Sequence, residues 1–84
     1  MPIDKEKIFA VIKANTLRIL SEVPPDDITI DGNLTDLGAN SIDRVEIVMY
    51  SLQELNLKIP APELHGLKNL RAVVDLFYRH AAAQ

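Results

Sequence analysis

A chain of 84 residues is long enough for one small domain, which buries only about 60–65% of its unfolded surface. The formal net charge is −3, from 12 acidic and 9 basic residues, which argues against a clustered basic face for nucleic acid. The absence of cysteine excludes disulfides, thiolate metal ligands and cysteine nucleophiles. No apolar run approaches the roughly 20 residues of a membrane span, and the charged N-terminus lacks the apolar core of a signal peptide. We therefore expect one domain over residues 1–84, in the cytoplasm.

The first predicted helix runs from about Asp4 to Ser21. Asp4 precedes a run of helix formers and is a good candidate for the N-cap, and Pro24 and Pro25 end the helix because a residue before proline is pushed out of the α region. Apolar residues recur at steps of three and four and predict one buried stripe, composed of Ile8, Phe9, Ile12, Thr16, Ile19, Leu20 and Val23.

A long loop follows, from Glu22 to Asn40, with turn signals at residues 24–27, 31–33 and 37–38. Structureless loops of this length are uncommon in compact domains. Isolated apolar residues punctuate it, and we expect them to attach the loop to the core: Ile28, Ile30, Leu34 and Leu37.

Three further helical patterns complete the chain. One begins at Ser41 or Ile42 and ends at about Leu55, and a short one covers residues 61–65 between prolines and Gly66. The last starts after an Asn69 cap and has an apolar face of Leu70, Val73, Val74 and Phe77. Helical periods without a sheet pattern predict an all-α antiparallel bundle with three longer helices and one short one.

Two good capping residues, Asn40 and Ser41, stand side by side at the start of the second helix, although one helix uses one cap. If Asn40 is the cap, Asp43 stands where a capping-box acid belongs, and the Ser41 hydroxyl is free on the first turn. A helix N-terminus favours a bound phosphate, so a phosphodiester on Ser41 would lie in a favourable field. The alternative from this pattern alone is that Ser41 is the cap and Asn40 a loop residue.

The apolar residues of the second helix cover an unusually wide arc, roughly 220° at 100° per residue. One edge of this arc, formed by Ile42, Val45 and Met49, should lie away from the main core and beside Ser41. The pattern is consistent with an apolar contact surface for a partner or cargo. It is equally consistent with a central helix packed on two sides.

Residues 37–49, L-G-A-N-S-I-D-R-V-E-I-V-M, resemble the prosthetic-group helix of acyl carrier proteins, which typically reads L-G-x-D-S-L-D-x-V-E-L-V-M. The resemblance continues through Ile59-Pro60 and residues 67–70 and covers essentially the whole chain. It implies a four-helix bundle without catalytic activity, with 4′-phosphopantetheine attached to Ser41 by a phosphopantetheinyl transferase. It also implies a monomer whose cargo is a thioester on the terminal thiol of the arm.

The chain departs from the family pattern at several positions on or near the second helix. Asn40 replaces the usual Asp, and Leu52 and Gln53 stand where many fatty-acid carriers have acids, so we expect a less acidic docking face. Tyr50 adds an aromatic residue near that face. The residues that we expect to contact partner enzymes are Asn40, Ile42, Asp43, Arg44, Val45, Glu46, Met49, Tyr50 and Gln53.

Residues 38–44 and 63–69 also resemble a narrower subgroup, the stand-alone donor carriers of β-branching cassettes in polyketide pathways. This resemblance implies an acetyl cargo, loaded by an acyltransferase or a ketosynthase-like decarboxylase. The acetyl group would pass to an enzyme resembling hydroxymethylglutaryl (HMG) synthase. The Met1 start and the absence of linkers favour a free protein.

The alternatives are weaker but distinct. A general fatty-acid, polyketide or peptidyl carrier would share the fold, although residues 38–41 do not match the peptidyl motif, and a helical interaction domain would use Ser41 only as a cap. The acidic residues of the second helix argue against DNA binding. The sequence also lacks the paired nucleophile and base that would indicate an enzyme. No metal site is expected, because residues 27–32 fail as a calcium loop at Thr29 and the two histidines lack partner ligands.

Overall fold

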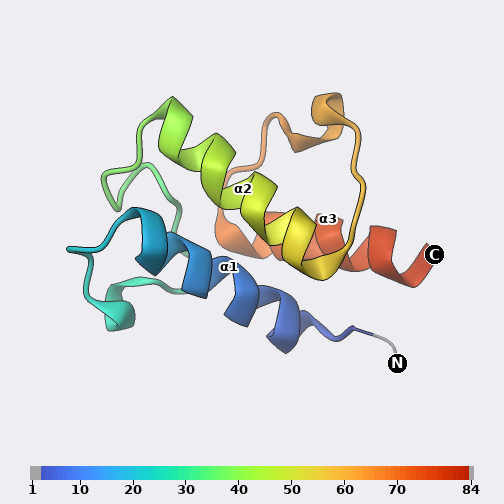
Figure 1. The fold of residues 1–84 in the computed structure, drawn as a ribbon, viewed down its shortest axis with the longest axis horizontal. Helices are drawn as coiled ribbons and strands as arrows, with labels where there is room; N and C mark the ends of the chain where they lie inside the picture. Colours follow the sequence, from blue (N-terminus) through green and yellow to red (C-terminus); the bar gives the residue numbers. More distant parts are fainter. Residues whose placement is uncertain (1–2, 84) are drawn as a thin grey trace.

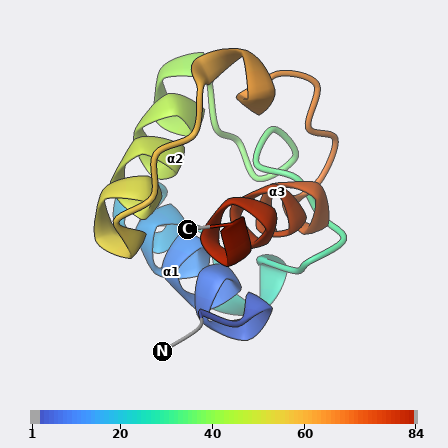
Figure 2. The ribbon, with the colours of Figure 1, turned by 90° about the vertical axis from the view of Figure 1, so that its right-hand side faces the viewer.

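The computed structural model describes residues 3–83. They form α1 (Lys5–Ile19), α2 (Ser41–Leu55) and α3 (Leu70–Ala83), with 3₁₀ turns η1 (Pro25–Asp27) and η2 (Ala61–Leu64). The helix α1 packs against both α2 and α3 (Figure 1). In the view of Figure 2, α2 lies at the left of the bundle, α3 at the right and α1 at the bottom. The turn η2 lies at the top, at the opposite edge from α1. The predicted all-α class is confirmed.

The short third element differs in type from the expected helix. It is one 3₁₀ turn of four residues between Pro60 and His65. Prolines at positions 60 and 62 cannot donate backbone hydrogen bonds, and so short a segment cannot offset the cost of nucleating an α-helix. The four predicted helices are therefore three α-helices and this turn, and the turn predicted at residues 24–27 is the 3₁₀ turn η1.

The first helix begins as predicted and ends earlier. Asp4 accepts a hydrogen bond from the Lys7 backbone N–H at 2.7 Å, which confirms it as the N-cap. The helix ends at Ile19 instead of Ser21, and Val23 closes a turn on the Leu20 carbonyl before the prolines. The predicted stripe is correct at Ile8, Ile12 and Thr16, but the buried set also contains Val11 and Asn15, which it missed.

The core gathers apolar residues from all three helices and from the segments between them. Phe77, Ile8 and Ile47 are completely buried at its centre. The predicted face of α3 is confirmed, and Leu57, just after α2, completes the core. The core also includes Ile28 and Leu34, while Ile30 and Leu37 pack partly buried against it. The expected attachment of the long loop by its apolar residues is therefore confirmed.

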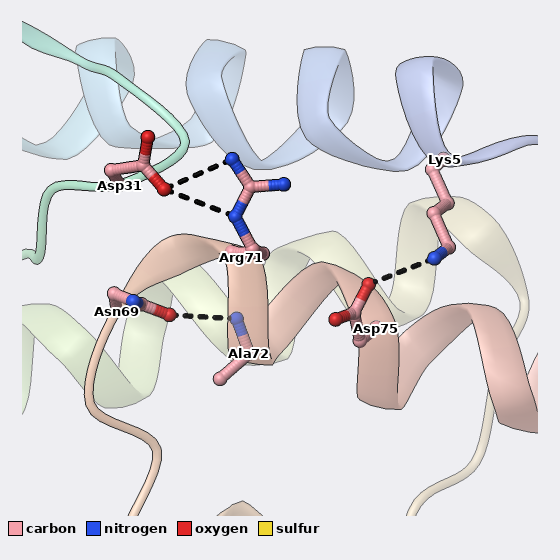
Figure 3. Close-up of polar contacts among 6 residues, drawn as sticks. All are labelled: Lys5, Asp31, Asn69, Arg71, Ala72 and Asp75. Carbon is pink, nitrogen blue, oxygen red and sulfur yellow. Dashed lines mark hydrogen bonds and ion pairs between the residues drawn. The ribbon is translucent and has the colours of Figure 1, made fainter.

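Hydrogen bonds attach the same loop to the start of α3. The first amides of a helix lack intrahelical acceptors, and here the backbone N–H groups of Leu70 and Arg71 donate to the carbonyls of Gly32 and Ile30 at 2.8 and 2.7 Å. The Arg71 guanidinium pairs with Asp31, and Asn69 caps the helix through the Ala72 N–H (Figure 3). These bonds fix the loop that leads to α2.

None of the helices within residues 3–83 is long and apolar enough to cross a membrane.

Candidate functional site at the start of α2

The N-terminus of α2 is closed by Asn40, not by Ser41. The Asn40 side chain accepts from the Asp43 backbone N–H at 2.8 Å, and the Asp43 carboxylate accepts from the Asn40 N–H at 3.2 Å. This reciprocal pair is a capping box. Of the two arrangements that the sequence allowed, the structure has the one that leaves the Ser41 hydroxyl outside the cap.

A tight turn directs the chain into this cap. Residues 34–38 form a turn in which Gly38 donates its N–H to the Thr35 carbonyl, and Ala39 returns to the core. Gly38 has a φ of +98°, a conformation that residues with a side chain rarely adopt. The buried Ala39 and the positive-φ conformation of Gly38 together place Asn40 and Ser41 at the surface.

Ser41 is exposed on the first turn of α2, with a cation beside it. The Arg44 guanidinium donates to the Ser41 Oγ at 3.4 Å and, more closely, to the Thr35 Oγ1 at 2.7 Å. The first-turn amides of α2 also lack intrahelical acceptors and carry positive partial charge. The hydroxyl is therefore accessible for modification in a locally electropositive environment.

The apolar edge of α2 next to Ser41 is exposed, as the helical period predicted. Ile42, Val45 and Met49 have 69%, 60% and 49% of their surface accessible to solvent, and they are three of the four large apolar side chains that are exposed in residues 3–83. Ile47 and Leu55 hold the opposite side of the helix in the core. The wide arc thus comprises a core face and a separate surface edge.

The other predicted contact residues are spread around the helix. Gln53 is exposed beside Met49, and Glu46 is half-buried. Tyr50 lies about 100° further around than Met49, where the Arg18 guanidinium of α1 stacks on its ring at 5.0 Å. The structure therefore groups Gln53 with the exposed apolar edge and places Tyr50 on the flank nearer α1.

Leu52 lies beneath the expected docking face and contributes little to its exposed surface. Its side chain is only 7% exposed and belongs to the core. At 100° per residue it lies between the core face and the exposed edge of the apolar arc, so the lower acidity of the surface at this point rests on Gln53 alone.

A shallow groove that the sequence patterns missed lies beside this edge. It has a volume of about 450 Å³, and its lining is mostly apolar: Met49, Leu52, Gln53, Leu57, Lys58, Ile59 and Pro60. One wall is α2, and the other is the segment that follows Asn56. Asn56 has a left-handed conformation (φ 55°), and the chain reverses direction there. Helical periodicity ends at Leu55 and could not show that the next segment folds back; only the Ile59-Pro60 match in the family pattern marked this region.

The histidines and acids of residues 3–83 form no cluster of three potential metal ligands. His80 instead contacts Glu63 at 3.1 Å and links α3 to η2.

The described residues form a helical bundle that exposes a serine on the first turn of α2, outside the N-cap. The sequence profile of the family described as "Phosphopantetheine attachment site" matches residues 12–77. The chain belongs to this family and is an acyl carrier protein, a non-enzymatic carrier with a covalently attached 4′-phosphopantetheine.

Its relatives include a carrier of polyketide biosynthesis and other acyl carrier proteins. The chain is 39% identical to the polyketide biosynthesis acyl-carrier-protein AcpK of Bacillus subtilis, over 89% of this chain and 92% of that protein. It is 37% identical to an acyl carrier protein of Clostridium perfringens, over 69% of this chain and 78% of that one.

A solved structure shares the fold closely. It is the crystal structure of the curacin biosynthetic pathway HMG synthase in complex with acetyl donor-ACP, with a TM-score of 0.84 and 35% identity. The match covers 92% of this chain and 99% of the other chain. The matched chain is therefore about as small as this one, which identifies it as the carrier of that complex.

The residues at the start of α2 fit a phosphodiester-linked arm. The Ser41 oxygen is exposed, the cap does not use it, and the Arg44 guanidinium lies beside it. When bound, the arm supplies a terminal thiol that holds acyl groups as thioesters. At this end of α2 the protein offers an exposed hydroxyl, a neighbouring guanidinium and an exposed apolar edge.

Proposed function

We propose that Ser41 carries the phosphopantetheine arm and that the protein delivers an acetyl thioester to an HMG-synthase-like enzyme in a polyketide pathway. The main support for attachment at Ser41 is the arrangement at the start of α2. Asn40 is the N-cap of the helix, and the Ser41 side chain lies outside the cap and is exposed. A serine used as the cap would have its oxygen occupied by backbone N–H groups.

The donor role is supported by the comparison with the solved complex. A carrier that is 35% identical over nearly its whole length forms a complex with an HMG synthase as an acetyl donor. The polyketide carrier AcpK is more similar in sequence than the Clostridium acyl carrier protein. On this surface, Gln53 replaces an acid common in fatty-acid carriers and leaves the apolar edge less flanked by charge.

The further partners follow from this role. A phosphopantetheinyl transferase attaches the arm, and an acyltransferase or a ketosynthase-like decarboxylase loads the acetyl group. We place the protein in the cytoplasm as a monomer, with Ile42, Val45 and Met49 as the apolar part of the docking face.

Intact mass measures the attachment directly. Coexpression with a broad-specificity transferase should add one phosphopantetheine to the wild-type protein and none to Ser41→Ala, which should fold normally because Asn40 still caps α2. Ser21→Ala, at another exposed serine, is the matched control and should gain the same mass as the wild type. A mass gain in Ser41→Ala would remove Ser41 from the proposal.

The donor role is measured with the acetyl-loaded protein. An HMG-synthase-like enzyme should consume it at least about tenfold faster than an acetyl-loaded fatty-acid carrier, since a contact difference of about 1.4 kcal/mol gives that factor. Gln53→Glu should narrow the gap without affecting the fold, because this side chain is exposed. Equal turnover of the two carriers would leave only the general role of an acyl carrier.

A further inference from the structure

The guanidinium of Arg44 is held in place beside the proposed attachment oxygen. Arg44 is the only basic residue of α2, three positions after Ser41 and on the same turn. Long side chains in a helix point back toward its N-terminus, which brings the guanidinium to the Ser41 Oγ at 3.4 Å.

A residue of the preceding loop fixes this position. The Thr35 Oγ1 accepts from Arg44 at 2.7 Å, a shorter contact than the one to Ser41. Thr35 belongs to the turn that Gly38 and the buried Leu34 fix against the core. Part of the conformational entropy that a free arginine loses on binding a ligand is therefore already lost here.

This guanidinium has no carboxylate partner among the described residues. The ion pairs within residues 3–83 involve Lys5, Arg71 and His80, and the Asp43 carboxylate on the same turn is engaged in the capping box. Arginine presents five donors in a planar fork that suits phosphate oxygens. Its contacts with two neutral hydroxyls leave both its charge and several donors unused.

We propose that Arg44, positioned by Thr35, binds the phosphodiester of the arm. This contact fixes the phosphate end of the arm on the side of α2 that faces Thr35. The inference rests on the proposed attachment to Ser41. Charge-assisted hydrogen bonds to phosphate are stronger than neutral ones. At 100° per residue, Arg44 and the apolar residues Ile42 and Met49 lie on opposite sides of Ser41. A phosphodiester bound by Arg44 therefore leaves the exposed apolar edge and the groove open to partner and cargo.

The experiment compares unmodified and phosphopantetheinylated protein in four forms: wild type, Arg44→Gln, Thr35→Val and Arg79→Gln. Arg79 is the matched control, since it is exposed near the C-terminal end of α3, away from the start of α2 (Figure 1). Intact mass first establishes that each form carries the arm. NMR then records the arginine Nε–H resonances and the ³¹P resonance of the arm, and thermal unfolding records the change in Tm on modification.

In the wild type and Arg79→Gln, modification should shift the Arg44 Nε–H resonance and raise Tm by about 1–5 °C, as expected for an exposed ionic contact in a small domain. Arg44→Gln should abolish the rise in Tm and change the ³¹P shift. Thr35→Val should give a smaller rise in Tm than the wild type, because the guanidinium loses its support.

Two negative results are distinguishable. Protein that carries the arm on Ser41 but shows the same ³¹P shift and Tm change in wild type and Arg44→Gln contradicts this inference alone. Protein that never gains the arm contradicts the proposed attachment and the inference together. The resonance of Arg44 in the wild type requires no mutation, so a folding defect in a variant does not obscure the answer.

Discussion

At the scale of single residues, the start of α2 assigns different roles to two adjacent polar side chains. Asn40 has the hydrogen bonds of a cap, whereas Ser41 has only the long contact from Arg44. The two positions should therefore respond differently to the same truncation.

Asn40→Ala should lower the free energy of unfolding by about 1 kcal/mol, because it removes one side of the capping box. Ser41→Ala should change it by less than about 0.5 kcal/mol, as expected for an exposed residue outside a cap. Urea unfolding of the unmodified proteins measures both values. The reverse order of the two effects would show that Ser41 is the cap in solution.

A second pair of residues, Asn15 and Ser51, joins α1 to α2 inside the core. The Ser51 hydroxyl donates to the Ile47 carbonyl at 2.7 Å and accepts from the Asn15 amide at 3.3 Å, and both side chains are at most 3% exposed. Sequence periodicity did not identify this contact, because polar residues are ordinarily assigned to the exposed side of a helix.

Ser51→Ala should destabilise the protein by about 1–2 kcal/mol, since it leaves an N–H of Asn15 buried without its acceptor. The better helix propensity of alanine offsets part of this loss. Ser21→Ala, in an exposed turn, is the control and should be neutral within about 0.5 kcal/mol. Equal stability of the two variants in urea would mean that water replaces Ser51 as the acceptor.

At the scale of the element, α2 has two apolar surfaces that differ in burial. Met49 is 49% exposed and Leu52, three residues later, is 7% exposed. Both belong to the single apolar arc of the sequence, and burial divides it into a core face and a surface edge.

Met49→Glu should slow modification by the transferase and acyl transfer to partners by about tenfold, while Tm changes little. Ile47→Glu should unfold the protein or lower Tm strongly, because Ile47 is completely buried and the change places a charge in the core. Transfer rates and thermal scans on the two variants separate docking from packing. If Met49→Glu lost its fold as well, the exposed edge would have to be part of the core.

At the scale of the whole molecule, the long loop between α1 and α2 is a structural part of the bundle. Leu34 is 8% exposed in the core, and the loop carbonyls satisfy the first amides of α3. The same loop carries Thr35 and Gly38 to the start of α2, so its packing determines the geometry of the site.

Leu34→Ala should cost about 2–5 kcal/mol of stability, the usual range for removing a buried leucine. Arg71→Ala should cost less than about 1 kcal/mol, because the side chains of Arg71 and Asp31 are 54% and 74% exposed. Chemical unfolding of both variants makes the comparison. A neutral Leu34→Ala would show that the loop packs only loosely on the helices.

The sequence by itself determined the helices, the candidate serine and the class of carrier. Periodicity and capping residues located both ends of α2 and the start of α3 within a residue, since apolar spacing and caps are local properties. The family motif singled out Ser41, whereas local capping rules left both arrangements of Asn40 and Ser41 open.

Only the tertiary structure decided which of several locally possible contacts are made. Burial of Leu52, the Asn15–Ser51 bond and the groove after Asn56 depend on how segments far apart in the chain pack together. The position of Arg44 between Thr35 and Ser41 likewise depends on a loop that is attached to the core by the buried Ile28 and Leu34. Hydrophobic periodicity describes one helix at a time. The burial of a side chain depends on the other elements that it contacts, and the sequence of its own helix does not specify them.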